Sequence, residues 1–203
     1  MNILDVLLLP KKVYEKLTGK RHTLVLGIVL LGVADLLFDL FESRQRILVG
    51  KVPSVLYFNI TLTIVVTILV GLIDVLFFSL PLFDLFKYFK KEKSISNTGE
   101  HLVKLMKIYI CANMLVIPIN TVFHLIFSRE GFEQNPMASV LLSIYILIIP
   151  LWISAVVSRG ANAIYGFVPQ LRKMVFLAVF IWSSILWHVL GYIVDTWLIV
   201  LIK

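Results

Sequence analysis

The sequence predicts an all-α fold, a polytopic membrane helical bundle with five transmembrane helices and a short N-terminal interfacial helix. Three observations support this prediction. The 203 residues are 60% hydrophobic and only 15% charged, with a mean hydropathy of +0.96, whereas soluble domains are about 45–50% apolar. Five apolar segments approach or exceed the roughly 20 residues that a helix needs to cross the bilayer core. The basic residues gather mainly in the segments between them.

The predicted spans cover residues 23–41, 54–80, 102–127, 137–157 and 174–202. Together they fill a single membrane domain over residues 1–203 and leave no room for a separate soluble domain of ordinary size. Pro118 and Pro150 lie inside the third and fourth spans. Because proline removes a backbone hydrogen bond, both helices are expected to bend there. The single cysteine, Cys111, excludes an internal disulfide and is expected to be a small packing residue.

A short amphipathic helix is predicted before the first span, over residues 10–18. Pro10 suits the first turn of a helix. Lys12 and Lys16 lie on one side of this helix. The opposite, apolar face consists of Val13, Tyr14 and Leu17. This pattern is typical of a helix that lies in the membrane interface.

The distribution of the 19 Lys and Arg residues orients the chain. Most of them fall before the first span and in the second and fourth loops, so the positive-inside rule predicts a cytoplasmic N-terminus. The first loop, with Arg44, Arg46 and Lys51, is moderately basic although this topology assigns it to the outside. We expect a bacterial cytoplasmic (inner) membrane location, with a eukaryotic ER or Golgi membrane as the alternative. Anionic lipid headgroups, rather than nucleic acid, are the expected partners of the basic residues, and the surface candidates are Lys11, Lys12, Lys16, Lys87, Lys90, Lys91 and Lys93.

Polar side chains inside the predicted spans are candidates for function, because such residues are costly in hydrocarbon and often mark ion or substrate pathways. The predicted intramembrane polar cluster comprises Asp35, Asp39, Asn120, His124, His188 and Asp195. Most of it falls in the outer half of the membrane, whereas Asp74 and Asn113 fall towards the cytoplasmic half. Asp35 and Asp39 are four residues apart and share a helix face, where two charged carboxylates would repel each other. The cluster is either a path for protons or cations, or a hydrogen-bonded network that joins the helices.

Signatures of enzyme chemistry are absent from the sequence. It contains no Gly-x-Ser-x-Gly elbow, no Gly-rich phosphate loop and no His-Glu-x-x-His pair. We therefore expect no catalytic residues, no cofactor and no metal site.

Three stretches resemble the Yip (Ypt/Rab-interacting protein) domain family, in its short prokaryotic form. They are LPKKVYEKL at residues 9–17, residues 99–118 with a late proline, and residues 151–166. The resemblance implies a five-span helical fold with a cytoplasmic N-terminus. Eukaryotic members bind prenylated Rab GTPases. This chain lacks an Asp-Leu-Tyr-Gly-Pro motif, so Rab binding is not expected, and the resemblance assigns no functional residue.

Two hypotheses of function follow. The first is a non-enzymatic integral membrane protein of Yip type that organises membrane or recruits protein partners through its basic cytoplasmic face. Its expected partners are the lipid bilayer and a membrane protein or a second copy of the chain. The alternative is a small transporter, channel or lipid-handling protein that uses the intramembrane acidic residues.

Overall fold

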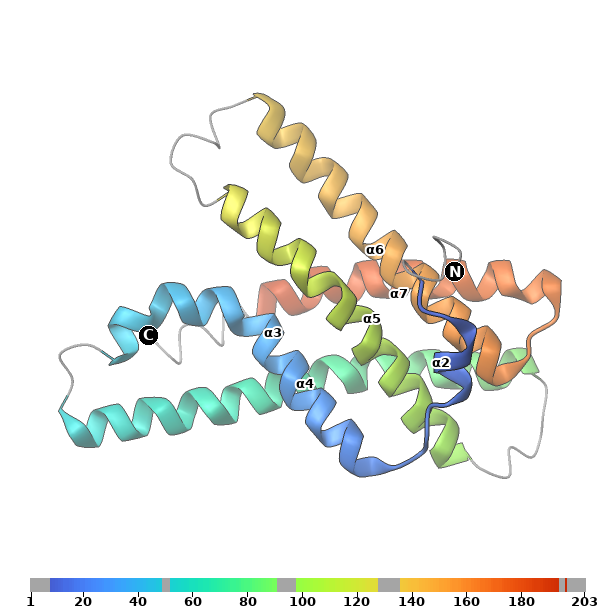
Figure 1. Cartoon of the computed structure of the whole chain (residues 1–203), viewed down its shortest axis with the longest axis horizontal. Helices are drawn as coiled ribbons and strands as arrows, with labels where there is room; N and C mark the ends of the chain where they lie inside the picture. Colours follow the sequence, from blue (N-terminus) through green and yellow to red (C-terminus); the bar gives the residue numbers. More distant parts are fainter. Residues whose placement is uncertain (1–7, 49–51, 91–97, 128–135, 194–195, 197–203) are drawn as a thin grey trace.

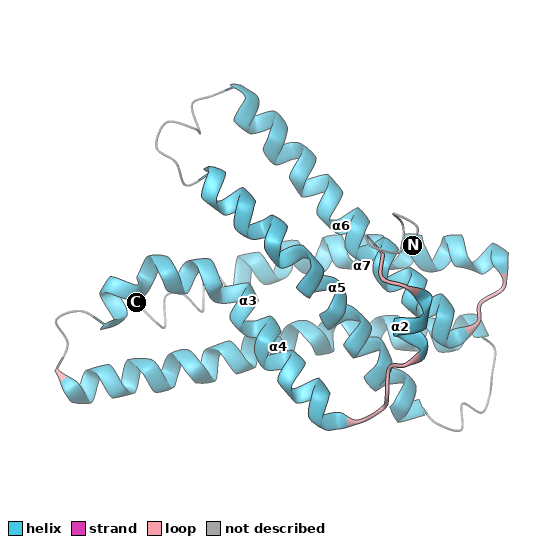
Figure 2. Ribbon diagram, viewed as in Figure 1, coloured by secondary structure: helices cyan, strands magenta, loops and turns pink. Residues whose placement is uncertain are grey.

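The computed structural model describes residues 8–48, 52–90, 98–127, 136–193 and 196, and the elements within these ranges are helical (Figures 1 and 2). The helices in chain order are α2 (Lys11–Glu15), α3 (Arg21–Leu48), α4 (Pro53–Lys90), α5 (Thr98–Phe127), α6 (Pro136–Tyr165) and α7 (Pro169–Ile193). No strand occurs within the described ranges. The predicted all-α class is confirmed.

Four helices of the described chain, α4 to α7, are long and apolar enough to cross a membrane. They show that the chain is an integral membrane protein. The first predicted span, residues 23–41, lies within α3, which is not among these four. The count of five spans is therefore not confirmed. The last predicted span extends into residues 194–202, most of which lie outside the described part of the chain.

The helices α3 and α4 cross with their backbones in direct contact, because glycine occupies the crossing point on both. A Cβ atom added at Gly71 would lie 2.7 Å from the backbone nitrogen of Gly32, and it would collide with the carbonyl oxygen of Ile28. A Cβ atom at Gly32 would collide with the carbonyl oxygen of Thr67. Small residues allow this close approach of helices in membranes.

The main core lies where α4, α5, α6 and α7 meet. Its largest fully buried aliphatic and aromatic side chains include Phe78, Phe86, Leu105, Ile108 and Val157. Figure 1 shows that the pair α3–α4 and the pair α5–α6 diverge away from this region.

The predicted interfacial helix is shorter than expected and docks on the bundle. Only Lys11–Glu15 is helical, and Tyr14 is 1% exposed while Val13 is 39% exposed. The Tyr14 hydroxyl lies 2.6 Å from the Leu8 carbonyl oxygen and 3.2 Å from that of Val156 on α6. The residues of the expected apolar face therefore have different environments. Tyr14 is inserted between helices, whereas Val13 stays exposed.

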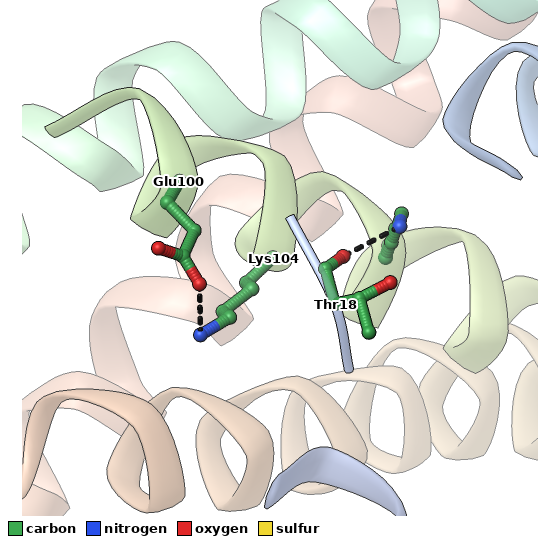
Figure 3. A network of polar contacts seen from close by, with 4 residues as sticks. Thr18, Glu100 and Lys104 are labelled. Atoms are coloured by element: carbon green, nitrogen blue, oxygen red, sulfur yellow. Dashed lines mark hydrogen bonds and ion pairs between the residues drawn. The ribbon is translucent and has the colours of Figure 1, made fainter. Parts of the chain in front are cut away.

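The connection from α2 to α3 is also held against α5. The ammonium group of Lys107 donates a hydrogen bond to the carbonyl oxygen of Thr18 at 2.6 Å. Figure 3 shows Thr18 beside α5, with the ion pair between Lys104 and Glu100 (2.7 Å) in the same region. These contacts and the docked Tyr14 fix the segment that leads into α3.

Candidate functional site

A cavity of about 260 Å³ lies among the five long helices. Apolar side chains from α3, α4, α6 and α7 form much of its wall. The polar side chains that line it are Asp35, Asp74, Tyr109, Asn113, Asn120, Tyr145 and Ser183. A mostly apolar pocket with a few convergent polar groups is the usual form of a small-molecule site.

Asp74 on α4 is one of two acidic residues at this cavity, and its carboxylate is held in place. Its side chain is 3% exposed. The Tyr109 hydroxyl on α5 lies 2.8 Å from one Asp74 oxygen and 3.0 Å from the other. The Tyr109 ring stacks on Phe78 with 3.7 Å between centroids. Because the phenol is itself fixed by stacking, the carboxylate has a defined position.

Asp35 on α3 is the second acidic residue. Its side chain is exposed and lines the cavity, and it lies close enough to Asp74 for the two charges to interact. Within the described residues, no hydrogen bond or ion pair holds the Asp35 carboxylate. The cavity thus has one anchored and one free carboxyl group, contributed by two different helices. Two carboxyl groups that line one cavity from different helices offer a site for a positive charge between them.

The other polar groups of the cavity lie on α5, α6 and α7. The Tyr145 hydroxyl donates a hydrogen bond to Asn120 Oδ1 at 2.7 Å, and its ring packs edge-on against Trp187 at 6.2 Å between centroids. The hydroxyls of Ser154 and Ser183 lie 3.2 Å apart and join α6 to α7. This part of the cavity therefore offers hydroxyl and amide groups next to aromatic faces.

Only part of the predicted polar cluster comes together here. Asp35 and Asn120 line the cavity, whereas His124 and His188 do not. His188 is exposed, and its Nδ1 lies 2.7 Å from the carbonyl oxygen of Ser184 in its own helix. The Asp39 side chain and the whole of Asp195 lie outside the described part of the chain. Among the side chains that the structure describes, no three His, Cys, Asp or Glu residues are grouped as metal ligands.

The cavity also has polar residues that were not in the predicted cluster, among them Asp74, Tyr109 and Tyr145. Asp74 was placed towards the cytoplasmic half, and no role was predicted for Tyr109 or Tyr145. The signal available in the sequence was shared depth, because Asp74 and Asn113 were both placed in the cytoplasmic half of adjacent spans. Which tyrosine would meet Asp74 depends on helix rotation, and the sequence does not specify it.

The predicted basic surface residues occupy several environments. Lys12 and Lys16 are exposed on the N-terminal segment. Lys87 and Lys90 are half-buried at the end of α4, with the Lys87 ammonium 5.6 Å from the centre of the Phe83 ring. The Lys11 side chain, Lys91 and Lys93 fall outside the described part of the chain.

Comparison with known proteins does not assign the chain to a family. No protein-family model, no curated protein and no solved structure matches it. The resemblance to the Yip family stays a prediction from the sequence. The four long apolar helices show a helical integral membrane protein.

Proposed function

We propose that this chain is a non-enzymatic small transporter or channel that binds a cation in its acidic cavity and passes it across the membrane. The observation that supports the proposal is the pair of carboxyl groups, Asp35 and Asp74, that line one cavity from two helices. Ionisable residues at membrane depth are costly, and those that face an interior cavity commonly mark ion or substrate pathways. A purely structural role would need each carboxylate to have a partner. Asp35 has none in the described part of the chain.

The arrangement suits a small positively charged ligand. Asp74 is anchored by Tyr109, so it provides a carboxyl group in a fixed position. Asp35 is free to approach a ligand, and a cation between the two carboxylates relieves their repulsion. The rings of Tyr145 and Trp187 also line the cavity, and aromatic faces attract cations. A volume of about 260 Å³ provides space for a proton-carrying water cluster, a partly hydrated cation or a small amine.

Movement of a ligand requires the helices around the cavity to change shape. Pro150 on α6 lines the cavity, and Pro118 lies inside α5. Proline removes a backbone hydrogen bond and weakens the helix locally. These two positions are therefore the expected bending points at which α5 and α6 open and close the cavity.

Cation flux in reconstituted vesicles tests the proposal. Vesicles that contain the purified chain and a trapped dye are given gradients of protons, sodium, potassium or methylammonium in turn. The dye is pH-sensitive for protons and methylammonium, and sodium- or potassium-sensitive for those ions. We expect the chain to accelerate collapse of at least one gradient relative to empty vesicles. The proposal is wrong if no gradient collapses faster than in empty vesicles.

A second candidate is a membrane organiser of Yip type. It is supported by the exposed Lys12, Lys16 and Lys20 on the N-terminal segment, which provide a basic surface for anionic lipids or a protein partner. In this proposal the chain lies in a bacterial cytoplasmic membrane with its N-terminus inside and forms oligomers with itself or a membrane-protein partner. A specific membrane protein that co-purifies with the chain after cross-linking, together with no cation flux, would favour this candidate.

A further inference from the structure

A second cavity, of about 310 Å³, lies under the N-terminal segment. Lys16, Leu17 and Thr18 line it from the connection that leads into α3. Lys107 and Cys111 line it from α5, together with Ile110. It shares none of its lining residues with the acidic cavity.

Lys107 is the unusual residue of this second cavity. Its side chain is 7% exposed, and its ammonium group has one hydrogen-bond partner among the described residues, the neutral carbonyl oxygen of Thr18. No acidic side chain in the described part of the chain forms an ion pair with it. The acid on the same helix, Glu100, pairs with Lys104 instead (Figure 3).

Two further lysine side chains increase the positive charge around Lys107, which favours a bound anion. Lys16 lines the same cavity, and Lys20 lies close enough for its positive charge to act on Lys107. A buried charge without a counter-charge is strongly unfavourable. Lys107 also retains N–H donors beyond the one that Thr18 accepts, because an ammonium group carries three.

We propose that this cavity binds a phosphate-bearing anion, with the phosphate oxygens at Lys107 and Lys16. Leu17 and Ile110 provide an apolar wall that suits the glycerol and first acyl carbons of a lipid. The phosphate belongs either to the headgroup of an anionic lipid or to a soluble phosphate compound. Anionic lipid headgroups commonly bind in basic pockets between transmembrane helices.

Cys111 provides a native reporter for this cavity, because it is the single cysteine of the chain and lines the site. The full chain is placed in nanodiscs of phosphatidylcholine, with or without phosphatidylglycerol, and the rate of Cys111 modification by methyl methanethiosulfonate is measured. A third sample contains phosphatidylcholine with inorganic phosphate added. We expect phosphatidylglycerol to slow the modification about tenfold, the effect of one charged contact.

Variants separate anion binding from an indirect change in thiol reactivity. For each variant, the quantity compared is the ratio of rates with and without the anion. Lys107→Gln and Lys16→Gln should each reduce the protection about tenfold, and Lys107→Arg should retain it. Lys173→Gln, which changes an exposed lysine on α7 outside the cavity, should leave the ratio unchanged.

The samples distinguish the source of the phosphate. Protection by phosphatidylglycerol alone supports a lipid headgroup, and protection by inorganic phosphate supports a soluble compound. Equal rates in all three samples would overturn the proposal. Protection that persists unchanged in both Lys107→Gln and Lys16→Gln would overturn it as well, and Lys16→Gln keeps this test valid if Lys107→Gln does not fold.

Discussion

The hydroxyl group of Tyr109 on α5 lies within 3.0 Å of both carboxylate oxygens of Asp74 on α4. This contact joins two helices inside the bundle and fixes one of the two acidic groups of the candidate cation site. The other, Asp35 on α3, faces the same cavity without such an anchor in the described part of the chain. The two carboxyl groups are therefore held differently: Asp74 has a fixed position, whereas Asp35 has no such anchor among the described residues.

Replacement of Tyr109 by phenylalanine tests this anchor. The ring still stacks on Phe78, whereas the Asp74 carboxylate loses its hydrogen bond while it remains 3% exposed. A buried polar group left without a partner costs about 1–3 kcal/mol, so the Tyr109→Phe variant should unfold at lower denaturant concentration in detergent. Tyr57→Phe, which changes a 73% exposed tyrosine, should unfold like the wild type. Equal stability of all three proteins would contradict a structural role for the Tyr109 hydroxyl.

The glycine contact between α3 and α4 should not tolerate a side chain. Gly71→Ala places a methyl group against the Ile28 carbonyl oxygen and Gly32, and overpacking of this kind costs about 1–3 kcal/mol. We expect lower thermal stability and a broadened size-exclusion profile. Gly99→Ala is the matched control, because nothing lies within 4 Å of its Cβ position, and it should behave like the wild type. A Gly71→Ala protein as stable as the Gly99→Ala protein would show that the helices do not meet at this glycine.

Docking of the N-terminal segment should depend on pH through Tyr14. Burial raises the pKa of the Tyr14 hydroxyl well above its usual value of 10.0, against a smaller opposing effect of the Arg159 charge. The unfolded chain therefore loses this proton at lower pH than the native chain. The stabilisation is complete below pH 10.0 and decreases as the pH rises further.

The comparison with Tyr14→Phe isolates this effect from the titration of lysines in the same pH range. We expect the thermal stability of the wild type to fall more steeply than that of Tyr14→Phe as the pH is raised above 10.0. Tyr192→Phe, which removes a hydroxyl from a 67% exposed ring, should keep the wild-type slope. Parallel slopes for the wild type and Tyr14→Phe would show that Tyr14 is not buried in its docked position.

The number of membrane crossings can be counted from the sides on which the two termini lie. If α3 crosses the membrane together with α4 to α7, five crossings place the termini on opposite sides. With four crossings, they lie on the same side. We expect an N-terminal fusion to report a cytoplasmic location and a C-terminal fusion the opposite one, as measured with fluorescent-protein and alkaline-phosphatase fusions. Two termini on the same side would contradict the five-span topology.

The sequence predicted the helical class and the positions of the long helices because lipid imposes a strong and simple condition on length and hydropathy. Each predicted span from residue 54 onward begins within one of the described helices α4 to α7. The sequence did not reveal that α4 continues through Pro81 to Lys90. The predicted second span ends at residue 80, ten residues before the helix ends.

The site was harder to predict because it depends on how each helix is rotated about its axis. Asp35 and Asn120 could be selected as polar residues in apolar segments, and both line the cavity. Asp74 is also a polar residue in an apolar segment. Its hydrogen bond to Tyr109, however, forms only if α4 and α5 are rotated so that these two side chains face each other. Tyr14 illustrates the same limit, because its apolar face was expected to lie in the membrane interface, whereas the structure buries Tyr14 against protein.

Cation flux in vesicles that contain defined variants tests the central claim most directly. The variants are Asp35→Asn, Asp74→Asn and a control, Asp84→Asn, which changes an exposed acid near the end of α4 that does not line the cavity. Removal of either charge at the cavity should lower the rate of gradient collapse at least tenfold, since one lost charged contact is worth about 1.5–3 kcal/mol. The Asp84→Asn protein should retain the wild-type rate. If Asp35→Asn and Asp74→Asn both fold and carry cations as fast as Asp84→Asn, the cavity is not the cation pathway.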